Sequence, residues 1–405
     1  MLNVCVVGLG GRGQGLIKSV LLNNDDIRIT AVCDLYEDRV QATLKLVGEK
    51  YDGATGYADY KEAIDREKPD AVYVFTGWEY HTEIAIYAME RGVAVASEVG
   101  CEYSLENLFK LVETQERTGT PYMFMENCCY NKDELLATAM ARRGVFGTIV
   151  HCSGAYGHDL RNEIVYGLKN RHYRFKNYEN RNLDNYPTHE LGPIARLLNI
   201  NRGNRIVSVS AFASKAAGLQ EYIASRADAD EVMKNTRFKQ GDIVTTIITC
   251  QNGETIQLRL DTALPRSYSR EFTVRGTKGQ YVQETNSVFL DGDKEYWVPS
   301  EYNRNTIDNA KQYEDEYLPE MWKSITPEQK QRGHGGMDWF VYKAFSDALL
   351  KGEKMPIDVY DAATWMAVAV LSEMSVAAGG APQLMPDFTK GRWYLRQPED
   401  VVDLS

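Results

Sequence analysis

Asn3–Gly15 reads NVCVVGLGGRGQG, and this stretch decides the fold of the first part of the chain. The apolar run 4–7 leads directly into glycines at Gly8, Gly10 and Gly13, after which apolar residues recur at helical spacing. The pattern predicts a strand, a tight turn and a helix. In such a turn the first glycine permits the bend, and the third lets the helix pack closely on the strand. The second lets the backbone approach a pyrophosphate, so the stretch predicts a dinucleotide site.

The second predicted strand, 27–33, identifies the dinucleotide. It ends in Asp34, about 20 residues after the glycine turn, where an acidic side chain accepts the ribose hydroxyls. A carboxylate repels the 2′-phosphate of NADP, and no Arg follows immediately, so we expect NAD. The phosphates should lie at the N-terminus of the helix, where free N–H groups and the helix dipole favour anions. The predicted ligands of this part of NAD are Gly8, Gly10, Gly11, Arg12, Gly13 and Asp34.

Composition narrows the class of protein. The chain has 405 residues, of which 43% are hydrophobic and 25% charged, which is typical of a soluble globular protein with two domains. Its formal net charge of -11 argues against nucleic acid or an anionic membrane as a partner. No apolar run approaches the ~20 residues of a membrane span. Because the first strand begins almost at Met1, we expect a cytoplasmic location, or a periplasmic or exported one if a leader has been removed.

Cysteine and histidine spacing suggests neither disulfides nor a metal site. The seven cysteines are an odd number, lie mostly in apolar contexts and lack CxxC spacing, so we expect buried thiols. No His, Asp or Glu spacing resembles a metal ligand set, so no metal is expected.

The order of the predicted elements divides the chain in two. Strands and helices alternate as far as about residue 126, which predicts an α/β Rossmann dinucleotide-binding domain at residues 1–130. Long strands then predominate, joined by turns such as Gln251-Asn252-Gly253. They predict a substrate-binding α+β domain at 131–405 with a large, mainly antiparallel open sheet. Helices at 337–350 and 362–378, the second capped by Asp361, should return to the seam between the domains. The exposed sheet suggests a homo-oligomer.

Polar residues follow several of the predicted parallel strands. Because ligands bind at the carboxyl ends of such strands, Trp78, His81, Glu98 and Asn127 should face one crevice. Trp78 and His81 are predicted to lie in a loop, 77–81, after the strand 71–75.

A long insertion, 157–202, separates the first two strands of the second domain. It holds His158, His172 and His189, three of the six histidines, with many Tyr and Arg residues. We expect a loop that is not stabilised mainly by apolar burial. Tyr rings offer apolar faces for sugar C–H groups, and Tyr, Arg and His supply hydrogen bonds, so this composition favours a sugar site. A solvated loop with local aromatic packing is the alternative.

Further motifs occur along the whole chain: 78–81 (WEYH), 126–130 (ENCCY), 158–161 (HDLR), 186–189 (YPTH), 239–246 (KQGDIVTT), 333–338 (GHGGMD) and 358–361 (DVYD). Together with the glycine turn and Glu98, they resemble the Gfo/Idh/MocA group of sugar-handling NAD(P) enzymes. Within that group, the resemblance is closest to glycoside hydrolase family 109, the NAD-dependent α-N-acetylgalactosaminidases.

One departure from the larger group distinguishes two activities. Sugar dehydrogenases of the group carry Glu-Lys-Pro after the fourth main strand, and this chain carries Glu98-Val99-Gly100. The Lys that helps to remove the hydroxyl proton is therefore absent, which counts against a simple dehydrogenase and agrees with the hydrolase branch. Asn185 likewise replaces the Asp that usually precedes the family His, whereas His189 is retained. The other residues expected to contact the cofactor are Trp78, His81, Glu98, Val99 and Asn127.

The resemblance implies a glycosidase that acts on terminal N-acetylhexosaminides, with α-N-acetylgalactosamine favoured. Bound NAD would oxidise C3 of the sugar, the C1–O bond would break by elimination after loss of the C2 proton, and water addition and re-reduction would follow. The cofactor is not consumed. Most glycosidases use a pair of carboxylates, and the absence of an evident pair in this sequence is consistent with a mechanism of this different kind.

The same resemblance assigns the residues at the sugar: Glu98, Tyr130, Arg174, Tyr186, His189 and Tyr268. His189 is expected to exchange the proton of the 3-hydroxyl. Tyr130 or Tyr186 is the candidate for the C2 base or the leaving-group acid, and Arg174 would favour its phenolate. Glu98 would orient the nicotinamide or contact the sugar, and Arg174 and Tyr268 would position substrate.

Two other functions stay open on the sequence. The first is an NAD-dependent sugar oxidoreductase, which the missing Lys disfavours. The second is a non-catalytic protein that senses NAD or a sugar, which the retention of His189 and Tyr186 disfavours.

Overall fold

The computed structural model describes residues 1–292 and 306–404. The chain forms two compact units: unit 1 contains residues 1–130 and 324–363, and unit 2 contains residues 131–323 and 364–405.

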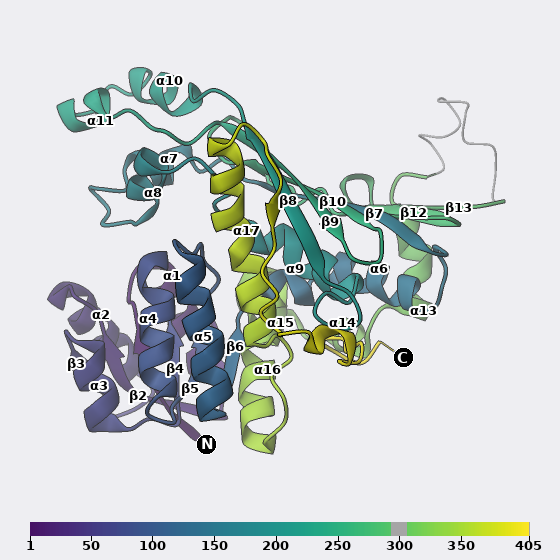
Figure 1. Ribbon diagram of the computed structural model, residues 1–405. Helices are drawn as coiled ribbons and strands as arrows, with labels where there is room; N and C mark the ends of the chain where they lie inside the picture. Colours follow the sequence, from purple (N-terminus) through teal and green to yellow (C-terminus); the bar gives the residue numbers. More distant parts are fainter. Residues whose placement is uncertain (293–305, 405) are drawn as a thin grey trace. The chain divides into compact units, whose positions relative to one another are not determined.

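Unit 1 is built on a six-stranded parallel sheet with the strand order β3-β2-β1-β4-β5-β6. The strands are β1 (Leu2–Val7), β2 (Ile27–Cys33), β3 (Thr55–Tyr57), β4 (Ala71–Val74), β5 (Ala94–Ser97) and β6 (Tyr122–Phe124). The helices between them are α1 (Gly11–Ser19), α2 (Glu37–Gly48), α3 (Tyr60–Glu67), α4 (Trp78–Met89) and α5 (Leu105–Thr118) (Figure 1). This order confirms the predicted Rossmann fold. The order reverses between β1 and β4, so a ligand is expected at the carboxyl ends of these two strands.

Two details of unit 1 differ from the sequence prediction. Strand β3 was not predicted, because three residues are too few to show a period. The predicted loop 77–81 is wrong, because Trp78–His81 form the first turn of α4, which begins directly after Gly77. Trp78, His81 and Thr82 are buried in this turn, and their packing outweighs the weak apolar periodicity at the helix start.

The last part of unit 1 comes from far along the chain. It contains α15 (Pro327–Lys330), α16 (Met337–Lys351) and the start of α17 (Val359–Ala377). The predicted cap of the last helix is wrong by three residues. The side chain of Asp358 accepts hydrogen bonds from the backbone N–H groups of Tyr360 and Asp361. Asp361 lies inside the helix, and its carboxylate accepts a hydrogen bond from the N–H of Asp358. The two side chains therefore cap the helix reciprocally.

Unit 2 is built on an eight-stranded sheet with the order β13-β12-β11-β7-β10-β9-β8-β14. Its strands are β7 (Ile149–Gly157), β8 (Ile206–Ala213), β9 (Ile243–Cys250), β10 (Thr255–Asp261), β11 (Thr273–Gly276), β12 (Gly279–Val282), β13 (Ser287–Leu290) and β14 (Gln383–Leu384). Strands β7 and β10 pair in parallel, and the other pairs are antiparallel. The predicted mainly antiparallel sheet is therefore confirmed. Figure 1 shows β7–β10 as long strands side by side.

The insertion 157–202 is folded, and the prediction of a loop without much apolar burial is wrong. It contains α7 (Arg161–Val165), α8 (Arg174–Asn180) and α9 (Thr188–Leu197). Apolar residues such as Ile164, Phe175, Leu191 and Ile194 are buried there. The sequence concealed α9 because Pro193 lies inside it. Helix α9 packs on β7 and so ties the insertion to the centre of the sheet.

The remaining helices of unit 2 are α6 (Lys132–Arg142), α10 (Gly218–Ala224), α11 (Glu231–Asn235), α13 (Glu314–Tyr317) and α14 (Glu320–Lys323). The later part of α17 also packs on the sheet, since the hydroxyl of Ser375 accepts a hydrogen bond from the N–H of Ala211 in β8. All seven cysteines are buried, as predicted. Within the described ranges, no helix combines the length and the apolar character that crossing a membrane requires.

Candidate functional site

The glycine turn of unit 1 is held by close backbone contacts. Gly8 has φ +100°, and a Cβ there would lie 2.4 Å from the carbonyl carbon of Phe75. A Cβ at Gly13 would lie 2.2 Å from the carbonyl oxygen of Gly8. Both positions therefore require glycine for the turn itself. At Gly10 the nearest atom to such a Cβ is 3.7 Å away, and at Gly11 none lies within 4 Å. The space above these residues at the start of α1 fits a group that approaches the backbone closely.

Asp34 joins the end of β2 to the same turn. One of its carboxylate oxygens accepts a hydrogen bond of 2.7 Å from the N–H of Leu9, and the other accepts from the N–H of Tyr36. The guanidinium of Arg39 lies 3.7 Å from this carboxylate. The glycine cradle, the N-terminus of α1 and the carboxylate of Asp34 together fit a dinucleotide.

Arg12 leaves the turn and connects two carboxylates of unit 1. Its guanidinium donates to Asp338 at 2.7 and 3.1 Å and to Glu98 at 3.1 Å. The hydroxyl of Tyr342 donates to the same oxygen of Glu98 at 2.7 Å. Burial lowers the pKa of the Arg12 guanidinium, but the charges of Glu98 and Asp338 raise it well above its ordinary value. Glu98 is thus fixed at the carboxyl end of β5.

Asp338, at the start of α16, is the centre of this group. It also accepts from the carboxamide of Asn127 at 2.7 Å and bonds the imidazole of His334 at 2.8 Å. Burial raises the pKa of Asp338, but the bond to His334 and the charge of Arg12 hold it below the ordinary value. Glu98 and Asn127, which the sequence placed at one crevice, therefore share one network through Arg12 and Asp338.

Trp78 and His81 lie beside the residue that follows Val99. A Cβ at Gly100 would be 2.9 Å from the indole of Trp78 and 3.0 Å from the imidazole of His81. His81 donates to the carbonyl of Thr76 at 3.0 Å, and burial lowers the pKa of its imidazole. Val99 is buried, and its aliphatic side chain carries no group that could move a proton.

Unit 2 contains a group of aromatic rings from β7, the segment before α9 and the first turn of α9. The centroids of Tyr156 and Tyr186 are 4.6 Å apart, and that of His189 lies 4.8 Å from Tyr186 and 5.5 Å from Tyr156. Tyr186 precedes the helix cap Pro187 and His189 is the second residue of α9, so the start of this helix brings the two rings into contact. A sugar ring can pack on aromatic faces while its hydroxyls bond the polar atoms.

Arg174 supplies a buried positive charge to this group. Its guanidinium carbon lies 5.0 Å from the ring centroid of Tyr186, and its Nε is 2.6 Å from the carboxylate of Glu163. Burial lowers the pKa of Arg174, but nearby Tyr residues and Glu163 raise it well above its ordinary value, so the side chain stays charged. Burial also raises the pKa of Tyr156, which favours its neutral phenol.

Tyr268 approaches the same rings from the segment before β11. Its centroid is 5.2 Å from that of His158, whose Nδ1 is 3.3 Å from the hydroxyl of Tyr156. Arg270 donates to the hydroxyl of Tyr268 at 3.2 Å and forms a buried ion pair of 2.7 Å with Glu134. About half of the Tyr268 side chain is exposed, which leaves it accessible to a ligand.

A second layer of polar groups lies behind these rings. The hydroxyl of Tyr178 bonds Thr262 at 2.6 Å and donates to Asn185 at 3.4 Å, and the carboxamide of Asn185 donates to Gln240 at 3.1 Å. Asn185 therefore serves to hold the segment that carries Tyr186.

Asp184 is completely buried next to this layer. It accepts from the hydroxyl of Thr246 at 3.1 Å and also bonds Glu190 and the N–H of Tyr186. Burial raises the pKa of Asp184 to about 7.

The structure thus brings Arg174, Tyr186, His189 and Tyr268 together in unit 2. Glu98 lies in unit 1, and so does Tyr130, which is buried in the short helix Asn127–Tyr130. The roles given to these residues stay predictions.

Comparison with known proteins identifies the family. A family model described as "Glycosyl hydrolase 109, C-terminal domain" matches residues 130–395, and one described as "Oxidoreductase family, NAD-binding Rossmann fold" matches residues 2–125. The chain belongs to glycosyl hydrolase family 109. It is accordingly a glycoside hydrolase with an NAD-binding Rossmann domain.

Relatives of this family 109 chain match it over almost its full length. A "Glycosyl hydrolase family 109 protein" of Stenotrophomonas maltophilia is 38% identical and covers 99% of this chain and 92% of its own. A protein of Tannerella forsythia named "Alpha-N-acetylgalactosaminidase" is 35% identical, covering 98% of this chain and 88% of its own. The crystal structure of scyllo-inositol dehydrogenase from Lactobacillus casei with NAD(H) and scyllo-inositol has a TM-score of 0.66 at 12% identity. It covers 95% of this chain and 99% of that one, which shows a shared fold.

Sequence reasoning missed three residues around the sites of this family 109 chain. Asp338 and Tyr342 hold Arg12 and Glu98, and their i, i+4 spacing on one helix was the signal that could have linked them. Tyr156 lies in a predicted strand, and no local pattern indicates that its ring contacts Tyr186 and His189.

Proposed function

We propose that this chain is an NAD-dependent glycosidase that releases terminal α-N-acetylgalactosamine from glycans. The observation that carries the proposal is the contact of Tyr186, His189 and the buried cation Arg174 in unit 2 of a family 109 chain. The name of the Tannerella forsythia relative supports the choice of sugar.

The residues that would hold the cofactor are those of the glycine turn and Asp34. Bound NAD would supply a reversible hydride acceptor for C3 of the sugar. The carboxylate of Asp34 can accept the ribose hydroxyls, and the N-terminus of α1 can accept the phosphates. Arg12 and Tyr342 keep Glu98 in one position, from which it would orient the nicotinamide or contact the sugar.

His189 is proposed to exchange the proton of the 3-hydroxyl. An imidazole gains and loses a proton near neutral pH, and this is the property that the step needs. The rings of Tyr156 and Tyr186 both lie next to His189, with centroids 5.5 and 4.8 Å from that of its imidazole.

Removal of the C2 proton needs a base that is available near neutral pH. A free Tyr loses its proton only near pH ~10, and a cation within ~4–6 Å favours the charged form of an acid. The guanidinium carbon of Arg174 lies 5.0 Å from the ring centroid of Tyr186, which makes Tyr186 the better supported candidate, and Tyr130 is the other. Arg174 and Tyr268 would position the substrate.

The oxidoreductase alternative is not favoured. Val99 is a buried aliphatic residue at the position where sugar dehydrogenases of the wider group use Lys, so the usual proton acceptor for net oxidation is missing.

The test is release of 4-nitrophenol from 4-nitrophenyl α-N-acetylgalactosaminide in deuterium oxide, with and without added NAD+. Hydrolysis with deuterium at C2 of the released sugar is the expected result. No hydrolysis, with NADH accumulating from a free sugar, would move the assignment to the dehydrogenase. Variants with Tyr186→Phe and Tyr130→Phe then identify the base, because loss of the base stops exchange at C2, whereas loss of the leaving-group acid stops elimination and leaves that exchange intact.

A further inference from the structure

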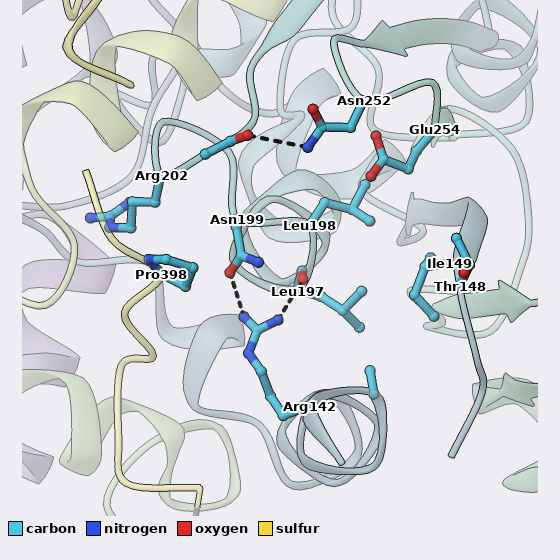
Figure 2. Close-up of a pocket in the computed structure, with 12 residues that line it drawn as sticks. Arg142, Thr148, Ile149, Leu197, Leu198, Asn199, Arg202, Asn252, Glu254 and Pro398 are labelled. Carbon is cyan, nitrogen blue, oxygen red and sulfur yellow. Dashed lines mark hydrogen bonds between the residues drawn. The ribbon is translucent and has the colours of Figure 1, made fainter. Parts of the chain in front are cut away.

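A pocket with a cavity of about 350 Å³ lies in unit 2, outside the aromatic group (Figure 2). Its wall includes Thr148 and Ile149 at the start of β7, Leu197 and Asn199 at the end of α9, and Asn252 and Glu254 around the β9–β10 turn. Its volume lies within the ~300–1,000 Å³ that is typical of small-molecule sites.

The pocket and the aromatic group lie at opposite ends of the same two elements. Strand β7 runs from Ile149 at the pocket to Tyr156 among the rings, a span of about 23 Å at ~3.3 Å per residue. Helix α9 begins with His189 in its first turn and ends with Leu197 at the pocket. The pocket is therefore not an extension of the aromatic group, and a ligand there would not touch Tyr186 or His189.

The cations of the pocket are already engaged. Arg142 donates to the carboxylate of Asp400 at 2.8 Å, to the carbonyls of Arg196 and Leu197, and to the side chain of Asn199 at 2.8 Å. Figure 2 shows this arginine on the side opposite Asn252 and Glu254. Arg202 is 2% exposed and donates to the carbonyl of Ile200. An anion would thus find the guanidinium of Arg142 committed and the side chain of Arg202 almost completely buried.

Several polar atoms on the wall are not engaged. The bonds that hold Asn199, Asn252 and Glu254 use Oδ1, Nδ2 and Oε2 respectively. Among the residues that the structure describes, Asn199 Nδ2, Asn252 Oδ1 and Glu254 Oε1 have no hydrogen-bond partner, so the wall offers one donor group and two acceptors. Glu254 is the only carboxylate among the lining residues, which is too few for a divalent cation.

The apolar part of the wall limits the ligand further. Leu197, Leu198, Ile149 and Pro398 offer aliphatic surface between the polar atoms. A ring that carries both hydroxyl groups and C–H faces satisfies the two kinds of surface together, because its hydroxyls can donate to Glu254 and Asn252 and accept from Asn199.

We infer that this pocket is a second binding site for a neutral, hydroxylated ring of the hexose class, separate from the site of hydrolysis. The inference does not depend on the proposed function, since binding here requires no turnover. Such a ring could be a sugar unit of a glycan or a free sugar.

The first experiment measures binding of free galactose by saturation-transfer NMR on the full chain. Glu254→Gln removes the charged acceptor at constant shape, and Ile149→Trp fills the cavity. We expect about tenfold weaker binding for the first, as for a lost bond to a charged group, and no binding for the second. Glu221→Gln is the matched control, because Glu221 is an exposed acid of unit 2 whose carboxylate forms no hydrogen bond or ion pair with the described residues. Galactose binding that is unchanged in both pocket variants would overturn the inference.

The second experiment separates the two sources of the ring. Hydrolysis of the aryl glycoside should be unchanged in both pocket variants, whereas KM for a glycoprotein that carries the same terminal sugar should rise if the pocket binds a glycan unit. Weaker galactose binding with unchanged KM for the glycoprotein would support a free sugar as the ligand. Should Ile149→Trp fail to fold, Glu254→Gln alone decides between these outcomes.

Discussion

Arg174 places a positive charge beside the ring of Tyr186, and its effect can be measured in a pH profile. A cation favours the phenolate, so Arg174→Gln should raise the pKa of Tyr186 and reduce the fraction of phenolate at neutral pH. If Tyr186 is the base, the rising limb of kcat/KM against pH then moves to higher pH. Arg174→Lys retains the charge and should move the limb less. A limb that does not move in Arg174→Gln would leave Tyr130 as the base.

Asp184 makes stability depend on pH in an unusual direction. Its pKa is raised to about 7 by burial, so between pH ~4 and 7 the folded chain holds a proton that the unfolded chain has lost. The contribution of Asp184 to stability is therefore greatest at low pH and falls as pH rises, by at most ~1.4 kcal/mol per pH unit.

Asp184→Asn should remove this dependence. Asn cannot ionise and can still accept from Thr246, so the Tm of the variant relative to the parent should increase steadily from pH 4.5 to 7. Thermal unfolding at several pH values measures it. A constant difference in Tm would show that Asp184 is charged in the folded chain throughout this range.

In the strand–turn–helix element at the N-terminus, substitution of single glycines should affect either the stability of the fold or the binding of the dinucleotide. Gly13→Ala would place a Cβ 2.2 Å from Gly8 and should lower the Tm, whereas Gly11→Ala, with no atom within 4 Å, should leave it unchanged. Gly10→Ala has room in the fold, so we expect an unchanged Tm and weaker NADH binding, followed by nucleotide fluorescence. Normal NADH affinity in Gly10→Ala would contradict the proposed position of the pyrophosphate.

The ion pair of Arg270 and Glu134 joins α6 to the segment before β11. The two side chains are 7% and 2% exposed, and breaking a buried pair by removing one partner costs about 3–5 kcal/mol. Arg270→Met should lower the free energy of unfolding by that amount, as measured by urea denaturation. The more exposed pair Lys176–Glu179, whose side chains are 64% and 28% exposed, is the control, because Lys176→Met should cost less than ~1 kcal/mol. Equal losses in both variants would mean that Glu134 is solvated.

At the scale of the whole molecule, NAD binding should increase the stability of the folded chain. A ligand at 100 times its Kd stabilises the folded state by about 2.7 kcal/mol, so NAD+ should raise the Tm. NADP+ at the same concentration should raise it less, because its 2′-phosphate would meet the carboxylate of Asp34. An equal rise with both nucleotides would overturn the predicted preference for NAD.

The features that the sequence predicted correctly depend on residues close together in the chain, and the features that it missed depend on residues far apart in the chain. The glycine turn, Asp34 and the long strands are local patterns, and the Rossmann fold and the mainly antiparallel sheet followed from them. Strand β14 has two residues, too few to show a pattern. Arg12 and Asp338 lie 326 residues apart, and no local pattern encodes such a contact. The ring of Tyr156 meets Tyr186 only because α9 packs on β7, a tertiary effect.

The late position of α16 has a consequence for synthesis of the chain. Tyr342 and Phe345 pack against Tyr73 at 5.7 and 5.5 Å between ring centroids, and Asp338 bonds Arg12. A ribosome adding about 5–20 residues per second reaches Asp338 roughly 16–65 s after Arg12. During this interval the nascent Rossmann sheet exposes the aromatic surface that α16 will cover. Newly made chains should therefore depend on chaperones until nearly the whole polypeptide has emerged.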